Sequence, residues 1–429
     1  MFCDLVGWSR CRRGIGMLCC MAGLLGALLP APAWSAPALT LQRAIALAVL
    51  RAPLVQAGRA REDAARADLD RAGRWPDPRL EFGVQNLTVQ GPGAFNPAAD
   101  SMTMRTIGFS QAIPSGTALA AERAGARAGA AAAGAETEQA RLHTRQAAAA
   151  AWVSLWAARR AREQLEELER QNTLVIVAAK ARLAGGTGST ADVLAAQAAQ
   201  AELANRLDQA DATVAAARAA LARWVGAAAA QATLADPPDF ARLPVTAAHL
   251  LQSPDAQAPL LGWTSREDRA EAALQGARAS KHPDWSVGLS YGVRAPGLPA
   301  MATLMVGVRL PLFPAHREDQ DILARRADLE AVRAERENAR RAQIEAVQRL
   351  LATWQGYGRQ VQRDRDTLLA LAADRSAAAL AAYRGGASLQ PWLEARRDEI
   401  TTRLDYVEAL KAWGDSWAEL AFLLPEYAQ

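Results

Sequence analysis

The sequence predicts a mainly helical chain that repeats itself once and supplies four strands to a membrane β-barrel. Long helices are predicted because no proline occurs between Ser115 and Asp236 or between Ala315 and Gln390, although the chain contains 21 prolines. Strands are predicted because two pairs of segments carry apolar residues at every second position. A tandem repeat is predicted because the same order of elements occurs in both halves of the chain.

The N-terminal segment, residues 1–36, has the features of a secretory signal peptide. Arginines precede an apolar core and small residues follow it, so we expect cleavage after Ala33 or Ala36. All four cysteines lie in this segment, which excludes disulfides, Cys-ligated metals and a thiol nucleophile from the mature protein. Lipid attachment at Cys19 or Cys20 is an alternative for this segment.

The first repeat covers residues 37–236. Thr40 is expected to cap an opening helix, and the prolines of Trp75–Pro78 must end it, because proline lacks the amide donor. Apolar residues at 4/3 spacing predict an antiparallel coiled-coil hairpin that turns at Gly185–Thr190. The expected elements are strands at about 79–87 and 102–113 and helices at about 115–184 and 189–226. The seam of the first long helix consists of Leu165, Leu168, Asn172, Val175 and Ala179.

A connector and the second repeat follow. Five prolines in residues 237–262 predict a non-helical, irregular equatorial connector that packs on the outside of the helices. The second repeat covers residues 263–429, opens with a short helix at 263–281 and has a glycine break at Gly385–Gly386. Its other elements are strands at about 285–294 and 301–312 and helices at about 315–384 and 388–423. The seam of its longest helix is expected to consist of Ile344, Val347, Leu351, Trp354, Val361 and Leu368.

The faces and the number of the strands predict how the barrel closes. In residues 285–293, one face is apolar and the other is small and polar, as in a strand between lipid and a water-filled lumen. Four strands leave two edges, and unpaired edges are not tolerated in a bilayer. Since about eight strands form the smallest membrane barrels, we expect three copies of the chain to give twelve.

Five segments resemble the TolC-like outer membrane efflux factors, and the resemblance covers essentially the whole mature chain. They are Leu39–Ile45, Gly108–Pro114, Gly307–Phe313, Gly186–Gln197 and Tyr383–Arg396. The resemblance implies a homotrimer with a barrel in the outer membrane of a Gram-negative bacterium and a helical tunnel across the periplasm. It also implies a periplasmic adaptor protein, an inner-membrane RND-type pump and outer membrane lipid as partners. The third segment looks most like the CzcC-like branch, which serves heavy-metal cation exporters.

Two groups of candidate site residues lie near the helix tips. The resemblance implies that the adaptor docks at the tips, whereas a hairpin also needs glycines simply to turn. The tip glycines are Gly185, Gly186, Gly188, Gly385 and Gly386. The resemblance also implies that Asp192, Tyr383 and Arg384 constrict the closed tunnel; the alternative is a helix cap and surface side chains. Trp392 stands where a second aspartate would complete an acidic ring.

Three aromatic residues form a further candidate group. Trp75, Trp285 and Tyr291 are expected in a girdle at the membrane interface, or else in packing where the barrel meets the helices.

The remaining motifs bear on function class. No nucleophile triad, phosphate loop or metalloprotease motif occurs, so we expect neither an enzyme nor a cofactor, and no basic patch favours nucleic acid. The cluster His316, Glu318, Asp319 and Asp321 offers cation ligands, although acidic residues also favour the first turn of a helix. The predicted function is passive conduction of substrate delivered by a pump, in the first place heavy-metal cations. The alternatives are a drug-efflux or type I secretion conduit and, from a different class, a non-conducting periplasmic coiled-coil scaffold.

Overall fold

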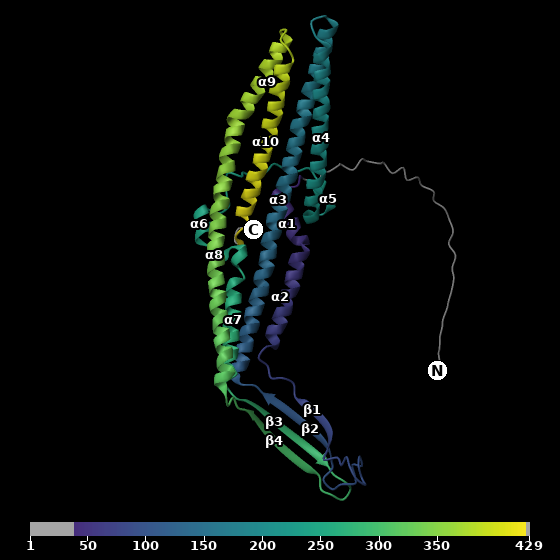
Figure 1. Ribbon diagram of the computed structural model, residues 1–429, viewed down its shortest axis with the longest axis vertical. Helices are drawn as coiled ribbons and strands as arrows, with labels where there is room; N and C mark the ends of the chain where they lie inside the picture. Colours follow the sequence, from purple (N-terminus) through teal and green to yellow (C-terminus); the bar gives the residue numbers. More distant parts are fainter. Residues whose placement is uncertain (1–37, 426–429) are drawn as a thin grey trace, which may run out of the picture. The chain divides into compact units, whose positions relative to one another are not determined.

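The computed structural model describes residues 38–425. The predicted signal peptide, with its cysteines and cleavage sites, lies outside the described residues. Most of the described chain is helical, and it also contains a four-stranded antiparallel sheet. Within these residues the sheet lies at one end of the long helices and the two glycine tips lie at the other (Figure 1). No helix of the described part is both long and apolar enough to cross a membrane.

The opening helix is interrupted once. Thr40 caps its first part, because its Oγ1 accepts a hydrogen bond from Arg43 N at 3.2 Å. Pro53 then restarts the helix in the first turn, where proline's missing N–H is harmless. The two parts are α1 (Leu41–Arg51) and α2 (Pro53–Arg71).

The first long hairpin consists of α3 (Gly116–Ala184) and α4 (Thr190–Val225). With 69 residues, α3 is about 100 Å long at the usual rise of 1.5 Å per residue. The sequence prediction for its seam is confirmed, since all five predicted residues of α3, from Leu165 to Ala179, are buried.

The second half repeats this arrangement with one difference. The helix predicted at 315–384 is divided by a π-helical turn, Asp364–Leu368, which has no counterpart in α3. A π turn adds a residue to the ladder and rotates the helix face that follows. Leu368, predicted in the seam, is accordingly 44% exposed, so this part of the prediction is wrong. The helices are α7 (Trp263–Ala279), α8 (Glu318–Arg363), α9 (Leu369–Arg384) and α10 (Gln390–Ala421), and a short 3₁₀ turn, Pro314–His316, precedes α8.

The connector is not fully irregular, so the expectation of a non-helical segment is wrong here. Thr246 caps a helix in the proline-free window after Pro244, and Leu250 of that helix is buried against Val347 and Leu351 of α8. The expected packing on the long helices is therefore present. The short elements are α5 (Ala227–Ala230), α6 (Ala247–Gln252) and two 3₁₀ turns, Pro254–Ala256 and Ala258–Leu260.

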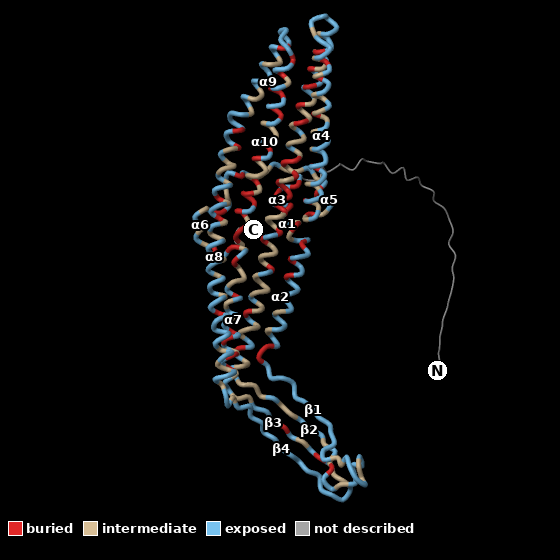
Figure 2. The backbone as a smooth tube through the Cα atoms, viewed as in Figure 1, coloured by how far each residue is buried: buried red, intermediate tan, exposed pale blue. Residues whose placement is uncertain are grey.

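The main core lies midway along the helices, where α1, α3, α4, α10 and the connector meet. Its tryptophans bury their rings and still satisfy their N–H groups. Trp152 Nε1 donates to Leu39 O at 3.0 Å, and Trp417 Nε1 donates to Arg242 O at 2.7 Å. Buried residues run along the helices, whereas the sheet is mostly exposed (Figure 2).

The sheet has the order β1-β2-β3-β4, with every neighbouring pair antiparallel. The central pair, β2 and β3, comes from the two different halves of the chain. It therefore joins the two predicted hairpins into one sheet. The strands are β1 (Arg79–Gln85), β2 (Met104–Ile113), β3 (Asp284–Val293) and β4 (Met301–Arg309).

Candidate functional site

The sheet has two chemically different faces. The strand register places Leu80, Phe109, Leu289 and Leu304 in one row across all four strands, and alternate residues continue that face. The large exposed apolar residues on it are Leu80, Phe82, Val84, Ile107, Phe109, Trp285, Val287, Leu289, Tyr291, Val293, Leu304, Val306 and Val308. The opposite face carries mainly small side chains, including Gly83, Thr106, Gly108, Ser110, Ser286, Gly288, Ser290, Gly292, Thr303 and Gly307. A sheet of this kind separates an apolar surrounding from a polar one.

The sheet also has two open edges. β1 and β4 are the outer strands, and neither has a second partner strand within residues 38–425. Their outward backbone N–H and C=O groups can pair only with another chain or with water.

The three candidate girdle aromatics lie on the surface, at different ends of the sheet. Trp75, Trp285 and Tyr291 are 59%, 48% and 51% exposed. Trp285 pairs with Ile113 at the helix end of the sheet, and Trp75 is near this end because Gln111 Nε2 donates to Pro76 O at 2.8 Å. Tyr291 lies six residues further along β3, which is about 20 Å at 3.3 Å per residue. The three residues thus mark two levels of the sheet.

An ion pair ties the strands to the helices. Asp284 accepts a hydrogen bond from Ser115 N at 3.0 Å through one carboxylate oxygen and from Arg309 Nη2 at 2.5 Å through the other. Ser115 is the residue that caps α3, and its own Oγ accepts from Ala118 N at 3.2 Å. The beginning of β3, the end of β4 and the start of α3 are therefore fixed to one another.

The first tip is a glycine turn. Gly186 has φ +73, a left-handed conformation that favours glycine, while Gly185 has an ordinary φ of −82. Gly188 has a steric role, because a Cβ there would lie 2.9 Å from Arg182 Cβ. Ser189 starts the next helix by accepting a hydrogen bond from Asp192 N at 3.1 Å.

The second tip has its glycines at the same distance from the next helix as the first tip, but different side chains stabilise it. Gly386 has φ +111, and nothing lies within 4 Å of the position that its Cβ would take. In place of the serine cap, this tip has Leu389, which makes no side-chain cap bond and is buried. Pro391 occupies the first turn of α10. The second tip is thus held by apolar packing where the first is held by a polar cap.

A small core, which we call the tip cluster, joins the two hairpins just behind the glycines. Tyr383 and Trp392 of the second hairpin are 0% and 2% exposed. Each hairpin contributes to the cluster, whose buried members are Val175, Ala179, Val193, Ala196, Tyr383, Leu389 and Trp392. The tryptophan that replaces the expected second aspartate therefore serves packing between the hairpins.

The three candidate gate residues have different surroundings. The Arg182 guanidinium lies 4.5 Å from the centre of the Tyr383 ring and donates to the Tyr383 carbonyl oxygen. Burial raises the pKa of Tyr383, as does the nearby charge of Asp192. The Tyr383 hydroxyl is buried without a hydrogen-bond partner among the described residues, and Arg384 is exposed. No local sequence pattern predicts the contribution of Arg182, because its partner lies 201 positions away.

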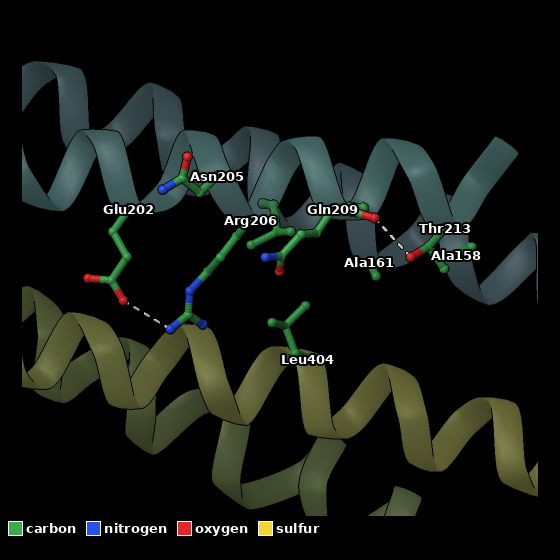
Figure 3. A pocket seen from close by; sticks show the side chains of 10 residues that line it. Ala158, Ala161, Glu202, Asn205, Arg206, Gln209, Thr213 and Leu404 are labelled. Carbon is green, nitrogen blue, oxygen red and sulfur yellow. Dashed lines mark hydrogen bonds and ion pairs between the residues drawn. The ribbon is translucent and has the colours of Figure 1, made fainter. Parts of the chain in front are cut away.

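A groove of about 560 Å³ lies between α3, α4 and α10. Figure 3 shows Glu202, Asn205, Arg206 and Gln209 of α4 on one side and Leu404 of α10 on the other. Glu202 and Arg206 form an ion pair of 3.2 Å within α4. The groove is therefore lined by polar and apolar side chains without an excess of charge.

The acidic cluster at the start of α8 is engaged in ion pairs. Asp319 pairs with Lys281, and Asp321 lies 3.4 Å from Arg325. Between residues 38 and 425 the structure contains no group of three His, Cys, Asp or Glu side chains placed to hold a metal ion. The geometry therefore favours the helix-start interpretation of this cluster over a cation site.

Comparison with known proteins assigns the fold. Residues 44–227 match the family model described as outer membrane efflux protein, which is less than half of the chain. VceC, an outer membrane protein of Vibrio cholerae, superposes with a TM-score of 0.73 at 18% identity, over 89% of this chain and 95% of that one. This chain has the TolC-like channel fold.

Two further structures agree. A membrane protein from Pseudomonas aeruginosa has a TM-score of 0.75 at 17% identity, with 89% of this chain and 93% of that chain covered. CusC, whose structures concern transmembrane channel formation, has a TM-score of 0.73 at 18% identity over 89% and 90% of the two chains. No curated protein matches the sequence. Since all of these identities are below 25%, the structural likeness concerns the fold and not the cargo.

Proposed function

We propose that the protein is the outer membrane channel of a tripartite efflux system in a Gram-negative bacterium. The observation that carries the proposal is the four-stranded sheet, with its largely apolar face, its face of mainly small residues and its two open edges. Three copies that pair β1 of one chain with β4 of the next give a closed barrel of twelve strands, with the apolar face toward lipid. We propose no catalytic role.

Membrane insertion and conductance test this proposal. The expected result is a trimer with heat-modifiable migration that forms pores in planar lipid bilayers. A soluble monomer without conductance would favour the alternative of a periplasmic scaffold. The sheet counts against a scaffold, because a scaffold has no need of a large exposed apolar face.

We further propose that a periplasmic adaptor protein docks at the two tips and that an inner-membrane RND-type pump supplies the energy. The tips support this, since both present exposed glycines at the same end of the long helices. Their open surroundings leave room for close approach of another backbone.

The glycines provide a prediction. Gly186→Val and Gly386→Val are expected to weaken adaptor binding about tenfold or more, because valine disfavours positive φ and deforms the turn. Gly186→Asn is the matched control, since asparagine tolerates φ near +60° and keeps the turn. Crosslinking or pull-down with the adaptor measures the effect. Equal binding by both valine variants and the wild type would contradict docking at the tips.

The gate residues provide a second prediction. Tyr383 is 0% exposed in the single chain, so its hydroxyl can take part in a closed gate only if the tips rearrange and bring it to a partner in another copy of the chain. Tyr383→Phe is then expected to raise leakage through the trimer while the thermal stability of the single chain changes by less than about 1 kcal/mol.

Entry of a large antibiotic into intact cells measures this leakage. Tyr406→Phe in α10, which is half-buried, serves as the control. Leakage equal to that of the wild type would remove the hydroxyl of Tyr383 from the gate. Two other candidates remain: Asp192 of the first tip, which lies near Tyr383, and Arg384 of the second tip, which is exposed.

For the cargo, we propose heavy-metal cations, with drug efflux or type I secretion as the alternative. The support is the resemblance of Gly307–Phe313 to the metal branch. A passive tunnel selects cargo weakly, so in this proposal the pump defines the substrate. Deletion of the gene, followed by growth on zinc, cobalt, copper and a panel of drugs, distinguishes the two.

A further inference from the structure

An apolar cavity of about 390 Å³ lies beside the main core, between α1, α3, the connector and α10. Its walls include Ile45 and Val49 of α1, Pro244 of the connector, and Trp417 and Phe422 at the end of α10. The two aromatic rings meet edge to face, with their centroids 6.2 Å apart. The volume is in the range of small-molecule sites, which are mostly apolar with a few polar groups.

One cationic side chain, Arg145 of α3, lines this cavity. Its Nη1 is buried without a hydrogen-bond partner, and Arg145 forms no ion pair with any described residue. The nearby carboxylate of Glu138 is already bonded to Arg141 at 2.9 Å. Burial lowers the pKa of Arg145, as expected for a guanidinium that has lost water without gaining an acceptor.

We propose that this cavity binds a small amphipathic anion, such as a medium-chain carboxylate. The hydrocarbon chain of the ligand lies against the aromatic wall, and its head group lies at Arg145. Nη1 itself has no exposed surface, so the head group bonds to the part of Arg145 that lines the cavity, for which the described residues provide no acceptor. The apolar walls bury the chain of the same ligand. Neither a neutral apolar molecule nor a free inorganic anion satisfies both parts of the cavity. The proposal does not depend on the conduction of cargo.

Binding of decanoate tests the proposal. The probe is titrated calorimetrically into the full-length protein in lipid nanodiscs, and the heat of empty nanodiscs is subtracted. Decanoate is expected to bind, and decanol to bind about tenfold more weakly, because it lacks the anionic head. Arg145→Gln is expected to reduce decanoate affinity about tenfold and to leave decanol unchanged. Arg170→Gln is the matched control, because Arg170 is on the same helix and pairs with Glu167 on the surface.

A second variant tests the contribution of the ligand's hydrocarbon chain separately from that of its charged head group. Ala46→Trp adds bulk on the wall of the cavity and is expected to weaken decanoate and decanol alike. Because Ala46 is exposed, the variant leaves the core packing intact. Equal affinity of wild type and Arg145→Gln for decanoate would overturn the proposal, as would the absence of binding. A map of the assembled protein with a side chain of a neighbouring copy in the cavity would also overturn it.

Discussion

Leu289→Arg is expected to abolish insertion of the protein into the outer membrane. Leu289 lies in the middle of β3, is 56% exposed and is in register with Phe109 and Leu304 on the apolar face. An arginine on the lipid face near the bilayer midplane costs about 2–4 kcal/mol, and a trimeric barrel carries three of them. The total approaches the whole stability of a typical domain, about 5–15 kcal/mol. The amount of heat-modifiable trimer in the membrane fraction measures this loss.

Ser290→Arg is the matched control, since it places the same side chain one residue further along the same strand. The side chain then lies on the face of small residues, opposite Gly108 and Thr303. We expect this variant to insert and to conduct less, because three arginines narrow and charge the lumen. Equal amounts of membrane trimer for Leu289→Arg and Ser290→Arg would show that the apolar face does not contact lipid.

The strands and their faces were predictable from the sequence, because alternation with period two is a local property of each segment. Trp285, Val287 and Leu289 reveal their common face without knowledge of a partner strand. The pairing of β2 with β3 is different. It joins residues such as Phe109 and Leu289, which are far apart in the chain, so no local pattern specifies it.

The tips were predictable in position but not in packing. Glycine pairs at equal offsets mark both turns, and the structure places turns there. Whether a side chain beside a turn faces solvent or the other hairpin depends on the angle between two hairpins that are 200 residues apart. Tyr383 is buried for this reason. Trp392 is the residue that indicates this packing in the sequence, because a large aromatic side chain at the start of a helix is expected to be buried against a neighbouring element.

Two local features of the helices were missed for opposite reasons. Thr246 is a recognisable helix cap in the sequence, but the prolines around it favour the prediction of a non-helical connector over that of α6. The π turn at Asp364–Leu368 has no comparable signal, because its residues also suit an ordinary helix. Asp364, the first residue of this turn, is buried in the folded chain.

Trp392→Ala is expected to loosen the two hairpins from each other near their tips. The side chain fills the centre of the tip cluster, and truncation of a buried tryptophan typically costs about 3–5 kcal/mol. The next buried cluster, around Leu168 and Ile400, lies about two helical turns away and has its own packing. The effect should therefore be local. Hydrogen exchange of the amides from Val175 to Ala196 is expected to accelerate, while exchange near Trp152 stays slow.

Leu194→Ala is the matched control, since Leu194 belongs to the same tip but is 59% exposed. Its truncation is expected to change exchange little, as exposed positions usually shift stability by about 0.5 kcal/mol or less. Unchanged exchange in Trp392→Ala would show that the tip cluster does not hold the hairpins together. If exchange accelerates and adaptor binding falls in parallel, docking requires the two tips as one rigid surface. If exchange accelerates while binding persists, each glycine turn is recognised by itself, because the turns depend on Gly186 and Gly386 and not on the tryptophan.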